Sequence, residues 1–435
     1  MKKKVAVCWF RRDLRMNDNV AFFYALKSEF PVLPLFIFDQ EILDNLSNKK
    51  DKRVNFIHDQ LTSMNKFFQE YGSSFLVLYD TPLAAFKSLD EEYSVEAVFT
   101  NEDYEPYAIH RDQQVTDYFK EKNIPFHSCK DQVIFEKSEI VKSDGSPYHV
   151  FTPYSKIWFK HFNELTLPSY PSEKLLSNLL RTDSLPFPSL KEIGFEKTKV
   201  EILPLQIDKA TLENYDKSRN IPGIAGTSHV SIHLRFGTIS IRELVRTAEK
   251  SNQVFLKELI WREFFMMLLF HYPKVVNHNF NPKYDFIKWR NDEKEFKKWC
   301  VGETGFPLVD AGMRQLNETG WMHNRVRMIV AGFLCKDLLI DWRWGEAYFA
   351  EKLLDYELSS NNGNWQWAAG TGADAAPYFR IFNPTTQIGK FDSKLAYIKQ
   401  WIPAFRPGYL PEMVDHDFAR KRALEVYKEA LNEKQ

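Results

Sequence analysis

Cysteine is scarce in this chain of 435 residues, which contains only four. They stand far apart, at Cys8, Cys129, Cys300 and Cys335, with no Cys-x-x-Cys pair and no spacing typical of a Cys/His metal site. This scatter fits a reducing cytosol and excludes the usual pattern of a structural zinc site. We therefore expect free thiols and no metal.

Long apolar segments are missing as well. At the N-terminus, MKKK is followed by only VAVCWF before RRDLR, which is too short an apolar run for a signal peptide. The longest apolar stretch, around residues 328–340, is interrupted by Lys336 and Asp337, so no segment qualifies as a membrane span. We expect a cytoplasmic protein, associated with the nucleoid if the source is bacterial.

The chain has no net charge, because 58 basic side chains balance 58 acidic ones. A slight basic excess after residue 206 is too small to indicate nucleic-acid binding, since a few charges are usually solvated surface. Aromatic residues, in contrast, are abundant, with 36 Phe, 19 Tyr and 11 Trp. They predict an aromatic-rich interior, in which plain core packing and stacking on a flat ligand are both open.

Residues 1–130 alternate short apolar runs with helical patterns. The runs VAVCWF, PVLPLFIF, SSFLVLY, AVFTN and IPFHS are typical of buried strands, and they predict a Rossmann-like parallel α/β sheet. No Gly-x-Gly-x-x-Gly motif follows the first run, and RRDLR stands in its place. This sheet should therefore not bind a dinucleotide in the usual way.

Two further regions follow the sheet. Residues 131–205 are rich in Pro, Ser and Lys with weak periodicity, which favours a connector draped over the surface. From about residue 206 to 435, apolar residues recur at a spacing of three to four, as in VFLKELIWREFFMMLLF, and predict an all-helical domain. The chain has no internal repeat and no low-complexity tract.

Two predicted helices collect polar and aromatic side chains on one face. In ELIWREF, the spacing places Glu258, Trp261 and Arg262 together. In WMHNRVRM, Asn324 and Met328 share a face in the same way, together with an arginine. Taken alone, each pattern is equally typical of an amphipathic helix with surface salt bridges.

The segment LLDYELSSNNGNWQWAAGTGADAAPYFR is the most informative one. We interpret SSNNGN as a Gly- and Asn-rich break before two tryptophans, which is costly unless something binds there. On a helix, Trp365 and Trp367 would point roughly 200° apart, because successive residues turn by about 100°. One ring can then face the interior while the other lines a cavity.

Together these stretches resemble the photolyases and cryptochromes, from FRRDLRMNDN near the start to FRIFNPTTQ and KFD near the end. WMHNRVRMIVAGFLCKDLLIDWR and NNGNWQWAAGTGADAAPYFR are similar to the class I cyclobutane pyrimidine dimer photolyases. The resemblance implies an antenna-type α/β domain over 1–130, an interdomain connector over 131–205 and a helical FAD-binding and catalytic domain over 206–435. It also implies light-driven repair of pyrimidine dimers in DNA by an electron from reduced FAD.

The resemblance places the FAD in the helical domain, in agreement with the missing glycine loop. The segment TSHVS matches the part that holds the diphosphate at a helix start. Around the isoalloxazine ring, an arginine would stabilise the anionic reduced flavin and a carboxylate would accept from the ring imide. Asn361 would face the reactive ring nitrogen, and an amide without an acidic proton favours cycling of reduced flavin over signalling. Glu357 stands where many relatives have the second aspartate of a D-x-D pattern. The implied flavin contacts are Tyr215, Thr227, Ser228, His229, Val230, Ser231, Asn324, Arg327, Asp355, Glu357 and Asn361.

For the substrate, the resemblance implies a cavity that takes a dimer flipped out of the duplex, with two tryptophans as stacking surfaces. Glu258 would hydrogen-bond thymine carbonyls as a protonated or proton-sharing carboxyl. Arginines at the rim would contact phosphates without reading sequence. The implied DNA contacts are Arg219, Glu258, Trp261, Arg262, Asn324, Arg325, Met328, Trp367 and Arg380.

Three more tryptophans match the chain that relays electrons from the surface to photoexcited oxidised flavin. They are Trp365, Trp342 and Trp289, and core packing alone would also explain indoles at these positions. With Glu258, Asn324 and Asn361 they complete the implied catalytic residues.

Other functions stay open within the same fold. A cryptochrome-type photoreceptor is the main alternative, although the chain ends at KEALNEKQ without a long polar tail. A six-four photolyase would have histidines where this chain has Asn324 and Met328, and DASH-type cryptochromes typically replace the residue at Trp367.

The second chromophore and the assembly state are less defined. Tyr107 and Ala108 occupy positions where folate-antenna relatives carry Asn and Glu, which argues against folate bound in that mode. A deazaflavin, a flavin or no antenna remain alternatives. We expect a monomer whose partner is damaged DNA, with no obligate protein partner.

Overall fold

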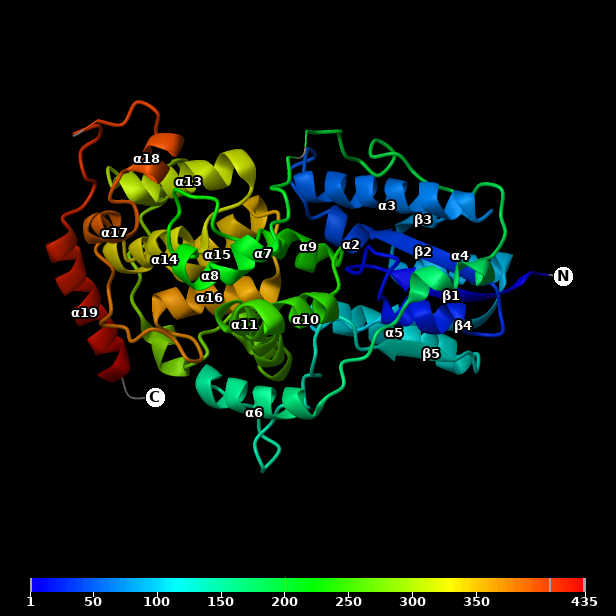
Figure 1. The fold of residues 1–435 in the computed structure, drawn as a ribbon. Coiled ribbons are helices and arrows are strands. Elements are labelled where there is room, and N and C mark those ends of the chain that lie inside the picture. Colours follow the sequence, from blue (N-terminus) through cyan, green and yellow to red (C-terminus); the bar gives the residue numbers. More distant parts are fainter. Residues whose placement is uncertain (1, 200, 407, 433–435) are drawn as a thin grey trace. The chain divides into compact units, whose positions relative to one another are not determined.

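The computed structural model describes residues 2–199, 201–406 and 408–432 (Figure 1). The chain forms two compact units, one of residues 1–136, 162–203 and 231–247 and the other of residues 137–161, 204–230 and 248–435. This division differs from the boundaries at 130 and 205 suggested by the sequence, because both units take part of the predicted connector and residues 231–247 return to the first unit. Within the described ranges, no helix combines the length and the apolar character needed to cross a membrane.

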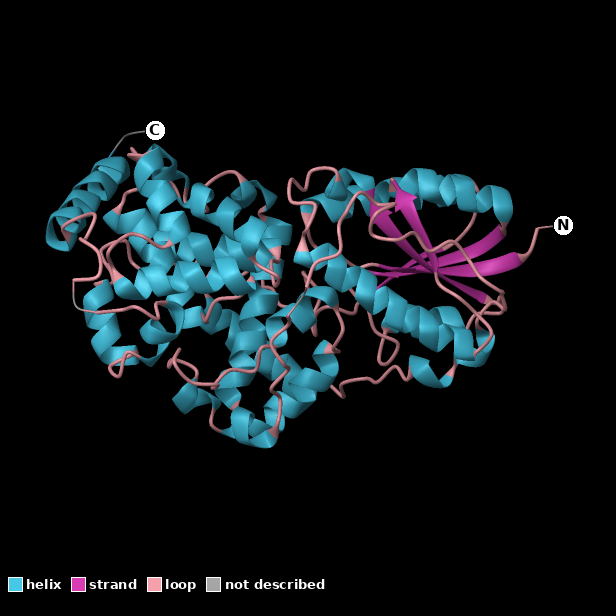
Figure 2. Ribbon diagram, turned by 90° about the horizontal axis from the view of Figure 1, so that it is seen from above, coloured by secondary structure: helices cyan, strands magenta, loops and turns pink. Residues whose placement is uncertain are grey.

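The first unit contains a parallel sheet in the order β3-β2-β1-β4-β5 (Figure 2). Each predicted run contributes one strand, which confirms the predicted α/β class. Strands β1 and β2 are buried along nearly their whole length, as expected for parallel strands covered by helices on both faces. The strands are β1 (Lys4–Phe10), β2 (Val32–Asp39), β3 (Leu76–Asp80), β4 (Ser94–Asn101) and β5 (Phe126–Cys129).

Helices pack on both faces of this sheet because successive β1 side chains point in opposite directions. Trp9 packs against Phe86 of α4 on one face, and Phe10 packs against Phe22 of α1 on the other. The helices of this region are α1 (Val20–Leu26), α2 (Gln40–Leu43), α3 (Lys52–Glu70), α4 (Pro82–Glu92) and α5 (Pro106–Glu121).

The loop after β1 performs a structural task instead of binding a phosphate. Arg15 pairs with the buried carboxylate of Asp131 at 2.7 Å, and Arg242 pairs with Asp131 and with Asp18, each at 2.9 Å. Gly237 has a φ of +65°, and a Cβ there would overlap the carbonyl of Arg12. These buried contacts explain why residues 231–247 belong to the first unit.

The predicted connector contains a helix, α6 (Phe151–Glu164), which the sequence analysis did not identify. Its buried side chains Phe151, Tyr154 and Trp158 are three and four residues apart, a helical spacing hidden among prolines, serines and lysines. Trp158 Nε1 donates to Glu263 Oε1 at 2.7 Å. Two short 3-10 turns follow, η1 (Ser172–Lys174) and η2 (Leu176–Asn178).

The rest of the chain is helical, which confirms the predicted helical FAD-binding region (Figure 1). Its main core lies among α13, α14, η5, α15, α16 and α18. The elements are α7 (Lys209–Glu213), α8 (Tyr215–Ser218), α9 (Val230–Phe236), α10 (Ile241–Ser251), α11 (Gln253–His271), η3 (Pro273–Val276), η4 (Pro282–Phe286), α12 (Glu293–Val301), α13 (Pro307–Thr319), α14 (Asn324–Gly332), the π-helical η5 (Phe333–Asp337), α15 (Trp342–Lys352), α16 (Leu358–Ala369), α17 (Pro384–Phe391), α18 (Ala396–Trp401) and α19 (His416–Asn432).

The segment SSNNGN is helical, so the break expected before the two tryptophans is wrong. Helix α16 runs through it because Glu357 caps its first turn. Gly363 lies inside this helix for a packing reason, since a Cβ there would overlap the ring of Phe265 on α11. The glycine therefore allows two helices to approach closely and does not end one.

Candidate active site

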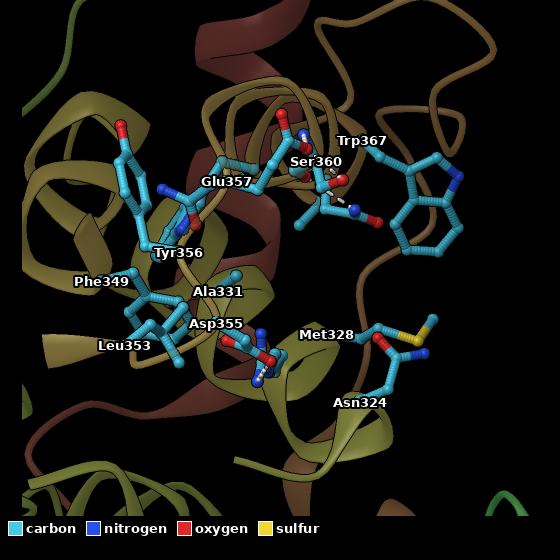
Figure 3. Close-up of a pocket in the computed structure, with 15 residues that line it drawn as sticks. Asn324, Met328, Ala331, Phe349, Leu353, Asp355, Tyr356, Glu357, Ser360 and Trp367 are labelled. Carbon is cyan, nitrogen blue, oxygen red and sulfur yellow. Dashed lines mark hydrogen bonds and ion pairs between the residues drawn. The ribbon is translucent and has the colours of Figure 1, made fainter. Parts of the chain in front are cut away.

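One pocket of the helical unit lies among α14, α15, the segment before α16, and α16 itself (Figure 3). It encloses about 590 Å³ of space not filled by atoms. Eight of the residues singled out in the sequence line it, so side chains up to 43 positions apart in the chain meet there. The lining residues are Asn324, Arg327, Met328, Ala331, Phe349, Leu353, Asp355, Tyr356, Glu357, Ser360, Asn361, Asn364, Trp365, Trp367 and Ala368.

A buried ion pair stands at the base of this pocket. Arg327 Nη2 donates to Asp355 Oδ2 at 2.8 Å, and its Nε donates to the carbonyl of Met322 at 2.8 Å. The Asp355 side chain is 3% exposed, and its other oxygen, Oδ1, is buried without a hydrogen-bond partner in the protein. A buried acceptor without a donor is unfavourable. An N–H group of a bound ring would satisfy it, so the donor set fits the flavin imide implied by the resemblance.

Asn361 is fixed by a carboxylate that the sequence analysis missed. Its Nδ2 donates to Glu346 Oε1 at 2.7 Å and to the Glu346 carbonyl at 3.1 Å. With both amide protons used, Asn361 can offer a pocket ligand only its oxygen, an acceptor. Burial raises the pKa of Glu346. No sequence pattern marks Glu346, because it lies 15 residues before its partner on another helix.

Glu357 lines the pocket, and its carboxylate caps α16. It accepts hydrogen bonds from the backbone N–H groups of Ser359 at 3.2 Å and Ser360 at 3.0 Å. The hydroxyls of both serines also donate to it, each at 2.7 Å. These bonds explain why an acidic residue occupies the position that caps α16. The flavin contact suggested for Glu357 stays a prediction.

The residues expected to hold the rest of the flavin lie outside the pocket lining. The segment 227–231 leads into α9, which begins at Val230, and His229 adopts a left-handed φ of +53°. Ser228 is buried, whereas Thr227 and Ser231 are half-buried. Tyr215 packs against Phe255 with ring centroids 5.0 Å apart, and burial raises its pKa to about 12.

His323 is a second residue that the sequence analysis missed. It caps α14 by accepting from the backbone N–H of Arg325 at 3.1 Å. Burial, assisted by Arg325 and Arg327, lowers its pKa to about 3, so the ring is neutral at pH 7. Its Nε2 is buried without a hydrogen-bond partner in the protein. The sequence WMHNRV contains His323 directly before the helix that it caps. The helical spacing that marked Asn324 and Met328 does not mark this histidine.

Only some of the predicted DNA contacts line the pocket. Those that do are Asn324, Met328 and Trp367, and those outside the lining are Arg219, Glu258, Trp261, Arg262, Arg325 and Arg380. Trp261 is stacked on Phe151, with centroids 3.8 Å apart and an angle of 7° between the rings. Arg325 donates to Asn220 Oδ1 at 2.6 Å, whereas Arg380 is exposed. In Figure 3, Trp367 of α16 lies on the same side of the pocket as Asn324 and Met328 of α14. Arg262 lies on α11 beside Trp261, half-buried.

Arg219 and Glu258, two further predicted DNA contacts, form an ion pair. Arg219 Nη1 lies 2.5 Å from Glu258 Oε1. The pair joins the end of α8 to α11.

The three relay tryptophans belong to one apolar cluster. Trp365 lines the pocket and is buried, as is Trp342 at the start of α15, and the half-buried Trp289 packs against the same cluster. Trp342 Nε1 donates to Asn279 Oδ1 at 2.9 Å. The cluster therefore extends from the pocket to a partly exposed ring.

Comparison with known proteins gives the family. A deoxyribodipyrimidine photo-lyase of Synechococcus sp. is 36% identical over 465 residues, covering 96% of this chain and 95% of the relative. This chain belongs to the DNA photolyase family. Residues 6–172 match the family model described as DNA photolyase, and residues 255–408 match the FAD binding domain of DNA photolyase. The second match contains every residue that lines the pocket.

Two solved structures have the same fold as this photolyase family member. A class III photolyase of Agrobacterium tumefaciens has a TM-score of 0.87 and 31% identity, covering 99% of this chain and 98% of the relative. An archaeal photolyase of Sulfolobus tokodaii, described with two FAD molecules, has a TM-score of 0.79 and 32% identity, covering 98% and 100%. Because a class III enzyme is so similar, membership of class I stays a prediction.

Proposed function

We propose that this protein is a light-driven lyase that splits cyclobutane pyrimidine dimers in DNA, and that it belongs to class I. The observation that carries the proposal is the single pocket lined both by Arg327, Asp355 and Asn361 and by Met328 and Trp367. The first group suits a flat, hydrogen-bonding ring, and the second suits a stacked, unpaired base. A photolyase needs both ligands in contact.

The chain's own residues would bind and orient the lesion. Arg219, Arg325 and Arg380 would neutralise phosphates, which gives affinity that falls with salt and does not depend on sequence. Trp261 and Trp367 offer indole faces to the extruded dimer. Asn324 supplies an amide for the base edges. Recognition would therefore rest on shape and on the ease with which a distorted lesion leaves the duplex.

Reduced FAD, when bound and illuminated, supplies the one electron that opens the cyclobutane ring and receives it back. Two carbon–carbon bonds of the dimer break, and no net oxidation or reduction remains. Arg327 would stabilise the negative charge of the reduced ring, and Asp355 Oδ1 would accept a hydrogen bond from its imide N–H group. Asn361 presents an oxygen, which suits a ring nitrogen that carries hydrogen. Glu258 donates to a thymine carbonyl as charge develops on the dimer.

The choice of lesion follows from Asn324 and Met328. Repair of a six-four photoproduct requires proton transfer between the two bases, a task suited to histidine because it titrates near neutrality. An amide and a thioether cannot pass a proton in this way. The protein should therefore repair cyclobutane dimers and leave six-four photoproducts unchanged.

Product analysis tests this assignment directly. Two oligonucleotides, each with one defined lesion, are illuminated with blue light in the presence of the reduced holoprotein. Restoration of only the cyclobutane strand is expected. Repair of the six-four strand would overturn the substrate assignment, and repair of neither strand despite bound reduced FAD would favour a cryptochrome-type photoreceptor.

We also infer the organisation of the working protein. Residues 206–435 would carry the FAD and the chemistry, residues 1–130 would form the antenna-type domain and residues 131–205 would connect them. All predicted site residues come from one chain, which supports a monomer that acts on DNA in the cytoplasm, at the nucleoid in a bacterium.

A second chromophore, if this chain binds one, would not be a folate held in the known mode. Tyr107 stands at one of the two positions where folate-antenna relatives carry Asn and Glu. Its hydroxyl donates to Asp39 Oδ2 at 2.6 Å, so this side chain is already engaged within the protein. The S. tokodaii relative is described with a second FAD, so a flavin or deazaflavin is the alternative to no antenna. Absorption and fluorescence spectra of the native protein distinguish these cases.

A further inference from the structure

Two residues that the proposed function assigns to different parts of the DNA are paired with each other in the free protein. Arg219 Nη1 donates to Glu258 Oε1 at 2.5 Å, although Arg219 is expected on a phosphate and Glu258 on a thymine carbonyl. The side chains of Arg219 and Glu258 are 20% and 31% exposed, so the pair is partly shielded from solvent. The guanidinium also lies 5.4 Å from the centre of the Tyr215 ring, which holds it in this position.

A neighbouring arginine makes this position suitable for an additional anion. Burial, followed by the charge of Arg219, lowers the pKa of Arg325, so the two guanidinium groups repel each other. Arg325 Nη2 donates to Asn220, but its Nε is buried without a hydrogen-bond partner in the protein. Of these two neighbouring cations, only Arg219 is paired with a carboxylate, that of Glu258, and the buried Nε donor of Arg325 is unused. A phosphate would neutralise the remaining charge and accept from both arginines.

The paired state of Glu258 cannot be the state that contacts the lesion. An ionised carboxylate only accepts hydrogen bonds, and a thymine carbonyl also only accepts them. Contact between the two requires a proton on Glu258. A phosphate at Arg219 would also place a second negative charge beside the carboxylate, which disfavours its ionised form.

We propose that binding of the lesion transfers Arg219 from Glu258 to a DNA phosphate, and that Glu258 takes up one proton from solvent in the same step. Arg219 is then a positioning residue for the reaction, because it keeps Glu258 charged and occupied until damaged DNA arrives. The step balances without an oxidant or a reductant, since the ion pair breaks, a phosphate ion pair forms, and one proton moves from the buffer to the Glu258 carboxylate. This inference rests on the proposed function.

The titratable groups near Glu258 keep their protonation states in this step, so Glu258 is the group that accepts the proton. Tyr215 on α8 lies within electrostatic reach of Glu258, and its pKa of about 12 keeps it protonated throughout. On α14, His323 is neutral with a pKa of about 3, and Arg325 stays charged. On α11 itself, Lys257 and Arg262 are the flanking charges.

Calorimetry in the dark measures the proton directly. The holoprotein is titrated with an oligonucleotide that contains one cyclobutane dimer, in two buffers of different ionisation enthalpy at the same pH. We expect uptake of one proton per lesion bound and none with the undamaged strand. As pH rises through the range in which binding takes up the proton, lesion affinity should fall by up to about tenfold per pH unit.

Variants assign the proton to this pair. Glu258→Gln should bind the lesion without proton uptake, because an amide donates without titrating. In Arg219→Gln, the pH at which lesion affinity begins to fall should be higher than in the wild type. Without its cation, Glu258 in the free protein would take up its proton at a higher pH. Arg380→Gln is the matched control, which loses an exposed predicted phosphate contact and should keep the wild-type pH dependence.

The possible outcomes distinguish failure of this exchange from failure of the proposed function. Repair of cyclobutane dimers with no proton uptake would overturn the exchange and leave the proposed function standing. Uptake that persists in Glu258→Gln would assign the proton to another group and would also overturn it. FAD absorbance of each variant verifies that the site is folded, and absence of repair by the wild type would contradict the proposed function itself.

Discussion

Asn361 gives both protons of its side-chain amide to Glu346, one to the carboxylate at 2.7 Å and one to the backbone carbonyl at 3.1 Å. The amide is therefore held with its oxygen as the only group left for the pocket. An oxygen acceptor suits a ring nitrogen that carries hydrogen, as in reduced flavin, and opposes one that carries none. We therefore expect Glu346 to favour the reduced ring in this pocket without touching it.

Replacing Glu346 by leucine should weaken this preference. The amide of Asn361 could then rotate and donate to the pocket, so bound reduced FAD should reoxidise faster in air in the dark. The measurement is the recovery of the oxidised flavin absorbance after photoreduction. Glu351→Leu, which removes an exposed carboxylate from the same helix, is the control and should reoxidise like the wild type. Equal rates in all three proteins would show that Glu346 has only a packing role.

The raised pKa of Glu346 also predicts a pH dependence of stability. Because burial raises the pKa of this carboxyl above its value in the unfolded chain, its contribution to stability is complete below the unfolded pKa and is lost as pH rises through the folded pKa. Glu346→Gln cannot ionise and should lose less stability between pH 4 and pH 8 than the wild type. Urea unfolding of both proteins at several pH values tests this, and parallel curves would contradict it.

Removing the cation of the buried pocket pair should be severe. Arg327→Met leaves the carboxylate of Asp355 as a buried charge without a partner, which typically destabilises a protein by about 3–5 kcal/mol. We expect loss of stability in denaturant and loss of bound FAD. The double variant Arg327→Met with Asp355→Asn removes both charges and should recover most of the stability without recovering FAD. Recovery of FAD in the double variant would show that the pair is structural only.

The electron relay can be separated from repair. Trp342→Phe should block photoreduction of oxidised flavin yet preserve repair by chemically reduced enzyme, because only the first process needs electrons from the surface. Trp299→Phe is a matched control, since Trp299 is equally buried in the same cluster and its ring lies 6.2 Å from that of Trp365. Loss of both activities in Trp342→Phe would indicate a structural tryptophan, and unchanged photoreduction would indicate another electron route.

The sheet and the helical unit were predictable because their signals are local. Strands buried on both faces have continuous apolar runs, as β1 and β2 do, and all five strands were identified from such runs. The burial expected for the last run is wrong, because half of the residues of β5 are exposed and none is buried. Helix α6 was missed because its apolar spacing is interrupted by polar residues and a proline. The expected break in α16 was wrong because Gly363 reflects contact with Phe265, a residue almost a hundred positions earlier, and not a local turn.

The site shows the same limit more strongly. The pocket lining could be named from the family resemblance, which carries Asn324, Asp355 and Trp367 residue by residue. The bond between Asn361 and Glu346, and that between Arg219 and Glu258, could not, because no periodicity or motif links residues on separate helices. Such pairs depend on tertiary packing, which brings side chains from separate helices together.

Trp367 and Glu258, two predicted contacts of the lesion, should affect different steps of repair. Trp367→Ala removes a stacking surface, so lesion affinity should fall by about 1–3 kcal/mol, whereas repair per absorbed photon should change little once the site is saturated. Glu258→Ala should do the reverse, because its hydrogen bond strengthens as the dimer gains charge, and so its loss reduces repair per photon more than affinity.

Both quantities can be measured on one oligonucleotide with a single cyclobutane dimer. Dark binding gives the affinity, and repair at saturating protein under counted photons gives the yield. Trp401→Ala, a half-buried indole that packs against the core and is not part of the pocket lining, serves as the control for loss of a tryptophan. If both variants lowered the same quantity, the two residues would share one role, and the division into a stacking wall and a charge-stabilising donor would be wrong. If Trp401→Ala lowered lesion affinity as much as Trp367→Ala, the effect would come from general destabilisation, because Trp367 lines the pocket and Trp401 does not.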